Sequence, residues 1–130
     1  MTAPLRAGTL IYAKDMALLA SFYRQLLSMS EVHATDELVV LRSPDVELIV
    51  HQIPAHIAAT FVVESPPVPR EDAAIKPFFP VASFAEAQAR ATSMGGALIG
   101  PQYEGPGFRI TNAYDPEGNI MQLREPIGSV

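Results

Sequence analysis

The chain contains no cysteine, and its basic residues are few and scattered. Without cysteine it can form neither a disulfide bond nor a thiolate metal site, and a cysteine nucleophile is excluded as well. Nine Lys and Arg face fourteen Asp and Glu, which gives a formal net charge of −5. Because binding to nucleic acid requires clustered basic residues, we expect no nucleic-acid partner.

Long hydrophobic runs are missing too. No run approaches the roughly 20 apolar residues that span a bilayer, and the N-terminus lacks the uninterrupted apolar core of a signal peptide. We therefore expect a cytoplasmic protein with no membrane partner. A hydrophobic fraction of 48% and a charged fraction of 18% over 130 residues predict one ordinary globular domain with a real core.

The first half of the chain has the pattern of a strand, a helix and three more strands. Residues 6–13 alternate and are β-branched or aromatic at their centre, which is typical of a strand. Asp15 stands at an N-cap position, and apolar residues then recur at helical spacing to about residues 27–29. The three strands are expected at residues 31–34, 37–41 and 46–52.

The second half repeats this order. Ser83 and Glu86 form the pattern of a capping box, and the helix that it begins should run to Met94, before Gly95-Gly96. Strands are expected at residues 75–81, 97–99, 108–114 and 119–125. Residues 100–107 are rich in turn formers and predict either a mobile flap beside a cavity, with Tyr103 covering a ligand, or a plain hairpin connection.

The element order βαβββ therefore occurs twice, which is an internal repeat. We interpret residues 1–130 as a single domain with a first module at about 5–53, a linker at 54–74 and a second module at about 75–126. The linker assignment rests on its four prolines. Sliding one module by 68 residues places Gly8 on Lys76.

Four stretches of the chain resemble the vicinal oxygen chelate superfamily, which includes glyoxalase I, extradiol dioxygenases, and the bleomycin and fosfomycin resistance proteins. They are IYAKDMALLASFYRQLL, VELIVHQ, FFPVASFAEAQARATSMGGALIGP and DPEGNIMQLRE. The resemblance implies an α+β fold in which two βαβββ modules curl into an incomplete barrel, usually in a homodimer. It also implies that function lies inside the barrel and differs between members.

Metal-dependent relatives hold a divalent ion with one histidine on the first strand and one carboxylate on the last strand of each module. The histidine positions fall on Gly8 and Lys76 here, and the carboxylate positions fall on Glu47 and Gln122. Two of the four ligands are lost, and at one of these two positions Lys76 places an ammonium group. We therefore expect no metal cofactor. His51 shares a strand face with Glu47, however, and a non-standard site of Glu47, His51 and Gln122 is the alternative.

Without a metal, Lys76 and Glu47 would form a charge-neutral cavity floor beside Gln122, or Lys76 would reach solvent past a shallow cavity mouth. Further candidate ligand-binding residues are Tyr12, His51, Phe78, Tyr103 and Arg109. If the strand phase does not slip by one residue, a first set of apolar residues faces the cavity and a second covers the helices. The first set is Leu10, Tyr12, Ile49, Phe78 and Ile120; the second is Ile11, Val46, Leu48, Val50, Phe79, Val81, Met121 and Leu123.

Three functions remain open at this point. The favoured one is metal-independent binding of a small organic molecule, of the bleomycin-resistance type. The second is a metal-dependent lyase or dioxygenase that uses the non-standard site. The third is a metal-free enzyme in which Lys76 acts as an acid or as an electrostatic stabiliser. Glu117 and Glu125 are expected to be turn and surface residues.

Overall fold

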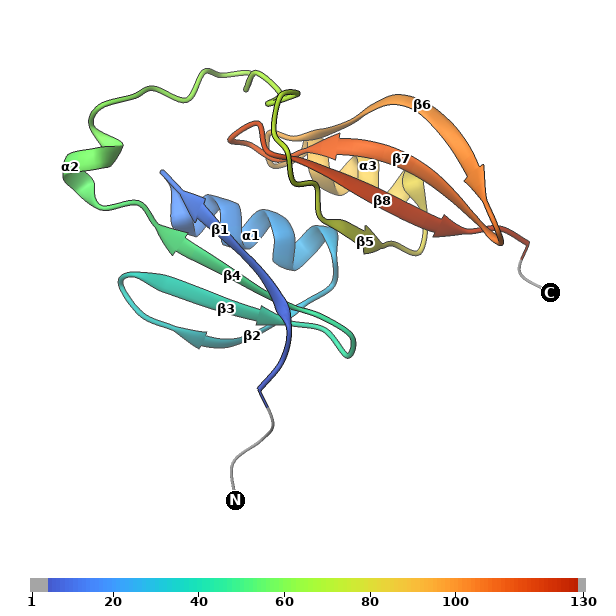
Figure 1. The fold of residues 1–130 in the computed structure, drawn as a ribbon, viewed down its shortest axis with the longest axis horizontal. Helices are drawn as coiled ribbons and strands as arrows, with labels where there is room; N and C mark the ends of the chain where they lie inside the picture. The colour runs from blue at the N-terminus through green and yellow to red at the C-terminus, as the bar shows by residue number, and fades with distance from the viewer. Residues whose placement is uncertain (1–4, 129–130) are drawn as a thin grey trace.

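Two four-stranded sheets, each built from one half of the chain, form the framework of the computed structural model, which describes residues 5–128 (Figure 1). The N-terminal sheet contains β1 (Gly8–Ala13), β2 (Ser30–Ala34), β3 (Leu38–Arg42) and β4 (Glu47–Gln52) in the order β1-β4-β3-β2. Strand β1 runs parallel to β4, and the other neighbours are antiparallel. The helix α1 (Met16–Leu26) follows β1, and the Asp15 carboxylate caps it by accepting a hydrogen bond from Leu18 N at 3.1 Å.

The C-terminal sheet repeats this topology. It contains β5 (Phe78–Pro80), β6 (Ala97–Gly105), β7 (Phe108–Tyr114) and β8 (Ile120–Pro126) in the order β5-β8-β7-β6, with β5 parallel to β8. Ser83 Oγ caps α3 (Phe84–Thr92) by accepting from Glu86 N at 3.2 Å. A short helix α2 (Ala55–Ala58) lies in the connection between the sheets. The expected α+β fold with two βαβββ modules is thereby confirmed, and the sheets do not close into a barrel.

Two strands of the second sheet differ from expectation. Strand β5 covers only residues 78–80 instead of 75–81, because Pro77 and Pro80 have no N–H to donate to the ladder. Strand β6 continues through most of the expected flap to Gly105, with an irregular register between Ile99 and Tyr103. The turn formers are accommodated as a bulge, so residues 100–105 form strand where a flap or a hairpin connection was expected, and only residues 106–107 connect β6 to β7.

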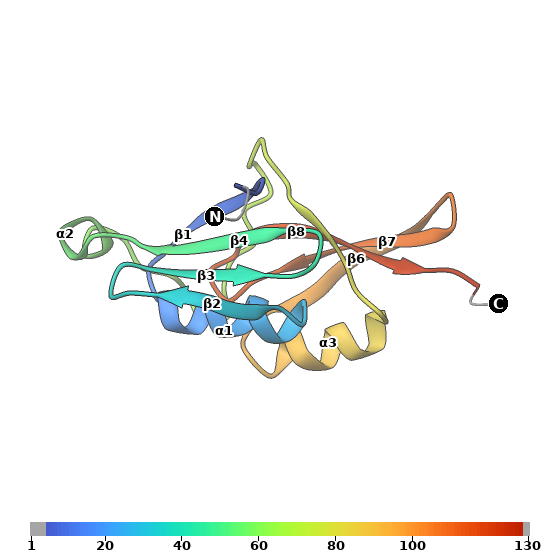
Figure 2. The same ribbon diagram turned by 90° about the horizontal axis from the view of Figure 1, so that it is seen from below.

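Both long helices lie on the same side of the two sheets, as Figure 2 shows. Leu48, Val50, Met121 and Leu123 face them and are fully buried. We call the other side of each sheet its open face. Leu10, Tyr12 and Phe78 lie there and keep 46%, 60% and 59% of their surface exposed. The predicted strand phase is therefore confirmed in both modules.

A buried hydrogen bond links α1 to the turn between β7 and β8. The Tyr23 hydroxyl donates to Asp115 Oδ2 at 2.7 Å, and neither residue is exposed to solvent. Asp115 also accepts from Asn119 Nδ2 at 2.8 Å, from Glu117 N at 2.9 Å and from Asn119 N at 3.1 Å. Burial raises the pKa of Asp115, against these donors, and burial together with Asp115 raises the pKa of Tyr23.

Glu117, expected to be a turn and surface residue, lies in the same turn but is buried. Its two carboxylate oxygens accept hydrogen bonds from Lys14 N and Asp15 N, both at 2.8 Å. These amides belong to the β1–α1 junction, so the turn of the second module satisfies the backbone of the first. Within residues 5–128, no helix is long and apolar enough to span a bilayer.

The raised pKa of Asp115 predicts a pH effect of defined sign. Above the unfolded value of about 3.9, the folded state binds more protons at this site than the unfolded state. This site therefore stabilises the fold less as pH rises toward the folded pKa. The Asp115→Asn variant does not titrate there, so the wild-type free energy of unfolding should fall relative to that of the variant from about pH 4 upward. Urea unfolding at successive pH values measures the difference, and an increase with pH would contradict the expectation.

Candidate functional site

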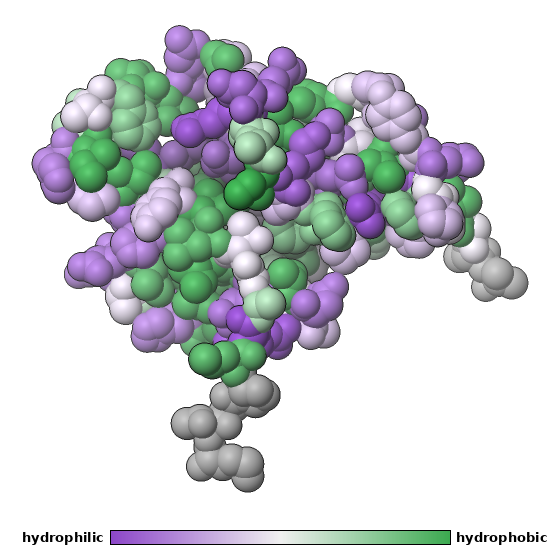
Figure 3. All heavy atoms as spheres, viewed as in Figure 1, coloured by the Kyte–Doolittle hydropathy of each residue, from purple (hydrophilic) through white to green (hydrophobic). Residues whose placement is uncertain are grey.

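The open face of the N-terminal sheet consists of three rows of side chains, which the strand register defines. Across β1, β4 and β3 the first row is polar, the second aliphatic, and the third begins with two rings. The rows are Gly8, Glu47 and Arg42; Leu10, Ile49 and Val40; and Tyr12, His51 and Leu38. The Tyr12 and His51 rings lie 5.4 Å apart between centroids. Figure 3 shows hydrophobic side chains gathered on this face.

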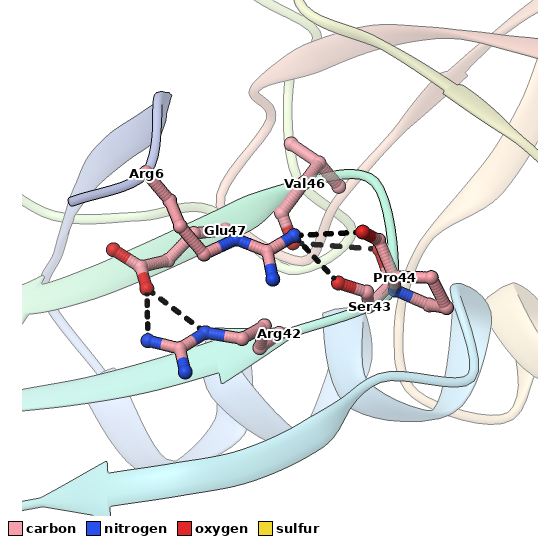
Figure 4. Close-up of polar contacts among 6 residues, drawn as sticks. All are labelled: Arg6, Arg42, Ser43, Pro44, Val46 and Glu47. Atoms are coloured by element: carbon pink, nitrogen blue, oxygen red, sulfur yellow. Dashed lines mark hydrogen bonds and ion pairs between the residues drawn. The ribbon is translucent and has the colours of Figure 1, made fainter. Parts of the chain in front are cut away.

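Glu47 is held by Arg42, its direct neighbour across β3 and β4 (Figure 4). Glu47 Oε1 accepts from Arg42 Nη2 at 2.6 Å and from Nε at 3.1 Å. Lys76 donates instead to Asn112 Oδ1 at 3.4 Å. The hypothesis that Lys76 pairs with Glu47 is therefore wrong, because Glu47 forms its salt bridge with the cross-strand Arg42 and Lys76 donates to Asn112.

The open face of the C-terminal sheet carries Gln122 at its centre. Phe78 lies opposite Gln122 on one side and Asn112 on the other. Gln122 Oε1 accepts from Arg124 Nε at 3.0 Å. Lys76 precedes β5, and its ammonium reaches Asn112 on β7, so this cation lies on the open face as well.

The sequence interpretation missed Arg124, although it stands two residues after Gln122 and must share its face. Its guanidinium carbon lies 3.9 Å from the Phe78 ring centroid and 4.9 Å from that of Phe108. Tyr103, 62% exposed, belongs to the same row, because it pairs with Ile110, which pairs with Arg124.

Arg109 does not belong to this face. It alternates with Ile110 along β7 and so points to the helix side, where its Nη1 donates to Glu125 Oε1 at 3.2 Å. Glu125 in turn accepts from Phe84 N at the start of α3. Arg109 and Gln122, which were predicted together as ligand-binding residues, therefore lie on opposite faces of the sheet, since side chains alternate along each strand.

Two small cavities lie where the end of the linker between the two modules meets the open faces. One of about 360 Å³ is lined by Leu10, Tyr12, Arg70 and Ile120, among others. The second, of about 230 Å³, is lined by Arg70, Lys76 and Asn112. A larger cavity of about 900 Å³ lies between the start of α1 and linker residues 62–67, and it includes none of the predicted site residues.

The positions at which relatives hold a metal do not fit one in this chain. A Cβ atom on Gly8 would lie 2.1 Å from Glu47 O, so a side chain there requires a backbone shift. Gly8 pairs with Glu47, whereas Gln122 pairs with Phe78 and not with Lys76. Gly8 lies eight residues before the first residue of α1, but Phe78 lies only six before the first residue of α3. Neither Phe78 nor a charged Lys76 supplies an electron pair to a metal.

The oxygen atoms that remain at the metal-ligand positions accept hydrogen bonds from arginine side chains. Glu47 accepts from Arg42 and Gln122 accepts from Arg124, and both guanidinium groups repel a cation. His51 lies four residues from Glu47 along β4, which is roughly 13 Å at strand rise. Its Nδ1 is 2.9 Å from Gln52 O. In the described part of the chain, no three or more His, Asp or Glu residues are grouped to hold a metal ion.

Comparison with solved structures identifies proteins of the same fold. A glyoxalase/bleomycin resistance protein/dioxygenase family enzyme from Burkholderia phytofirmans PsJN has a TM-score of 0.65 at 19% identity, over 91% of this chain and 95% of that one. The fosfomycin resistance protein FosX from Mesorhizobium loti has a TM-score of 0.63 at 14% identity, over 100% and 96%. A bleomycin-binding protein complexed with bleomycin has a TM-score of 0.59 at 17% identity, over 94% and 98%.

Comparison with curated proteins gives no match. Residues 9–124 match the family described as a glyoxalase-like domain, which is nearly the whole of both modules. This match and the shared fold confirm the resemblance to the vicinal oxygen chelate superfamily. The chain therefore belongs to the glyoxalase-like domain family.

Proposed function

We propose that the open faces bind a small organic molecule without a divalent metal. The proposal rests on one observation: each oxygen donor that stands at a metal-ligand position of the relatives accepts a hydrogen bond from an arginine. Arg42 donates to Glu47, and Arg124 donates to Gln122. Exposed apolar side chains stand beside these polar groups: Leu10 and Tyr12 on one sheet and Phe78 on the other. Apolar walls with a few fixed polar groups are typical of small-molecule sites.

The proposal includes a homodimer in which a second copy completes the cavity. The open faces keep large apolar side chains half exposed, and a contiguous apolar surface of this kind is typical of an interface or a ligand groove. The sheets do not close on themselves, so a single chain leaves the ligand-binding side uncovered. The association of two chains would exclude water from it.

The test uses the neutral fluorescent probe 1-anilinonaphthalene. We expect saturable binding to the purified protein, with the same affinity before and after treatment with EDTA, and twice the chain mass of 14.0 kDa in analytical ultracentrifugation. Ile49→Glu places a charge in the middle of the aliphatic row and should weaken probe binding about tenfold or more, since it puts a carboxylate where the probe is desolvated.

The matched control is Ala89→Glu, which adds the same carboxylate on the exposed side of α3 and should leave probe affinity unchanged. Circular dichroism verifies that both variants are folded. A stoichiometric metal whose removal abolishes binding would overturn the metal-independent proposal, and a monomer with unchanged affinity would overturn the shared cavity.

A further inference from the structure

We propose that the molecule bound on the open face of the C-terminal sheet is an aromatic anion whose acidic group pairs with Arg124. The inference rests on the proposed function and adds the chemical class of the ligand. It follows from how Arg124 is oriented, from which cations on this face lack a carboxylate partner, and from the rings around them.

Arg124 is oriented by its neighbours. Its Nε donates to Gln122 Oε1 at 3.0 Å, and its guanidinium carbon lies 3.9 Å from the Phe78 ring centroid and 4.9 Å from that of Phe108. Phe78 comes from β5 and Phe108 from β7, so the guanidinium is contacted from both sides of β8. A planar group held in this way loses little further entropy when it binds a ligand.

The charge of Arg124 is not compensated within residues 5–128. The salt bridges of this part of the chain join Arg42 to Glu47, Arg90 to Glu86 and Arg109 to Glu125. Neither Arg124 nor Lys76 takes part in one. Of the five N–H groups of a guanidinium, Arg124 uses the one on Nε, and its terminal nitrogens donate no hydrogen bond to the described residues.

The carboxylates of the neighbouring strands point away from this cation. Glu125 is adjacent to Arg124 along β8 and therefore faces the helices, where it binds Arg109 and Phe84 N. Glu104 pairs with Arg109 in the register and so shares that side. In a protein with net charge −5, the charged groups that Arg124 and Lys76 place on this open face are therefore both cationic. Glu71 of the linker lines the neighbouring cavity of about 230 Å³ together with Arg70 and Lys76.

The surroundings of Arg124 favour an aromatic body for the anion. Phe78 is 59% exposed and Tyr103 is 62% exposed, both on the same face as Arg124. A carboxylate or sulfonate can accept two parallel hydrogen bonds from the terminal nitrogens while its ring packs on these side chains. A cationic ligand would be repelled by Arg124 and Lys76 at short range.

A matched pair of probes tests the inference. The probe 8-anilinonaphthalene-1-sulfonate is 1-anilinonaphthalene with an added sulfonate, so the two differ in one anionic group. The wild-type protein should bind the anionic probe more tightly than the neutral one. Arg124→Gln should weaken the anionic probe about tenfold and change the neutral probe less than about twofold, as expected for the loss of a charge-assisted hydrogen bond.

The control is Arg109→Gln, which removes the same charge from the helix side of the same sheet and should leave both affinities unchanged. Equal affinity of the wild type for the two probes would overturn this inference and leave the proposed function standing. If Arg124→Gln weakened the binding of both probes equally, the inference would also be overturned, because Arg124 would then act only by positioning the Phe78 and Phe108 rings. If neither probe bound the folded wild type, the proposed function itself would fail.

Discussion

Replacing Asp115 by alanine is expected to lower the free energy of unfolding by about 3–5 kcal/mol. Four hydrogen bonds end on this carboxylate, from the Tyr23 hydroxyl, Asn119 Nδ2 and the amides of Glu117 and Asn119. Alanine removes all four acceptor contacts in a place where Asp115 has no exposure to water. The donors left behind then carry the cost of an unsatisfied buried polar group.

The effect should be this large because the carboxylate joins the two modules. Tyr23 belongs to α1 of the first module, and Asp115 begins the turn before the last strand of the second. Tyr23→Phe removes one of the four hydrogen bonds and should cost about 1–2 kcal/mol. Its cost should therefore be well below that of Asp115→Ala.

Urea unfolding at neutral pH, followed by circular dichroism, measures these differences. Asp45→Ala is the matched control, because Asp45 is an exposed turn carboxylate that accepts one hydrogen bond from Ser43 Oγ at 2.8 Å. It should cost less than about 1 kcal/mol. An Asp115→Ala variant as stable as Asp45→Ala would show that the link between the modules contributes nothing to stability.

Much of the fold could be predicted from the sequence, because side chains alternate along a strand and this alternation decides on which face of the sheet each residue lies. The alternation of Leu48, Ile49 and Val50 correctly placed the first and third against α1 and the second on the open face. The same holds for Asp15 and Ser83, whose short polar side chains each accept a backbone hydrogen bond at the start of a helix. These effects are local, because they depend only on residues that are close together in the sequence.

The candidate site was predicted less well because its contacts depend on register between distant strands. Glu47 pairs with Arg42 because the β3–β4 turn sets them opposite each other, which a list of charged residues does not show. Phe78, two residues after Lys76, is the residue that pairs with Gln122, and β5 is shortened by two prolines. Arg124 could have been found from its spacing to Gln122 alone, but its two ring contacts come from separate strands.

Replacing Gly118 by alanine should be the second strongly destabilising change, with an expected loss of about 2–5 kcal/mol in the free energy of unfolding. Gly118 lies in the turn before β8 at a φ of +85°, which costs an L-residue with a side chain roughly 1–2 kcal/mol. A Cβ atom there would also lie 2.3 Å from Val68 O of the linker. Because Arg70 N donates to Gly118 O at 2.8 Å, the linker cannot move away without losing that bond.

Gly107→Ala separates the cost of the positive φ from the cost of the contact with the linker. Gly107 has a φ of +86°, and a Cβ atom there meets nothing within 4 Å, so alanine should cost only the backbone term of about 1–2 kcal/mol. The difference between the variants in urea unfolding then measures the contact between turn and linker. Since Arg70 lines both small cavities of the open faces, Gly118→Ala should also weaken binding of 1-anilinonaphthalene, and Gly107→Ala should not. Equal stability of the two variants would mean that the linker does not rest on this turn in solution.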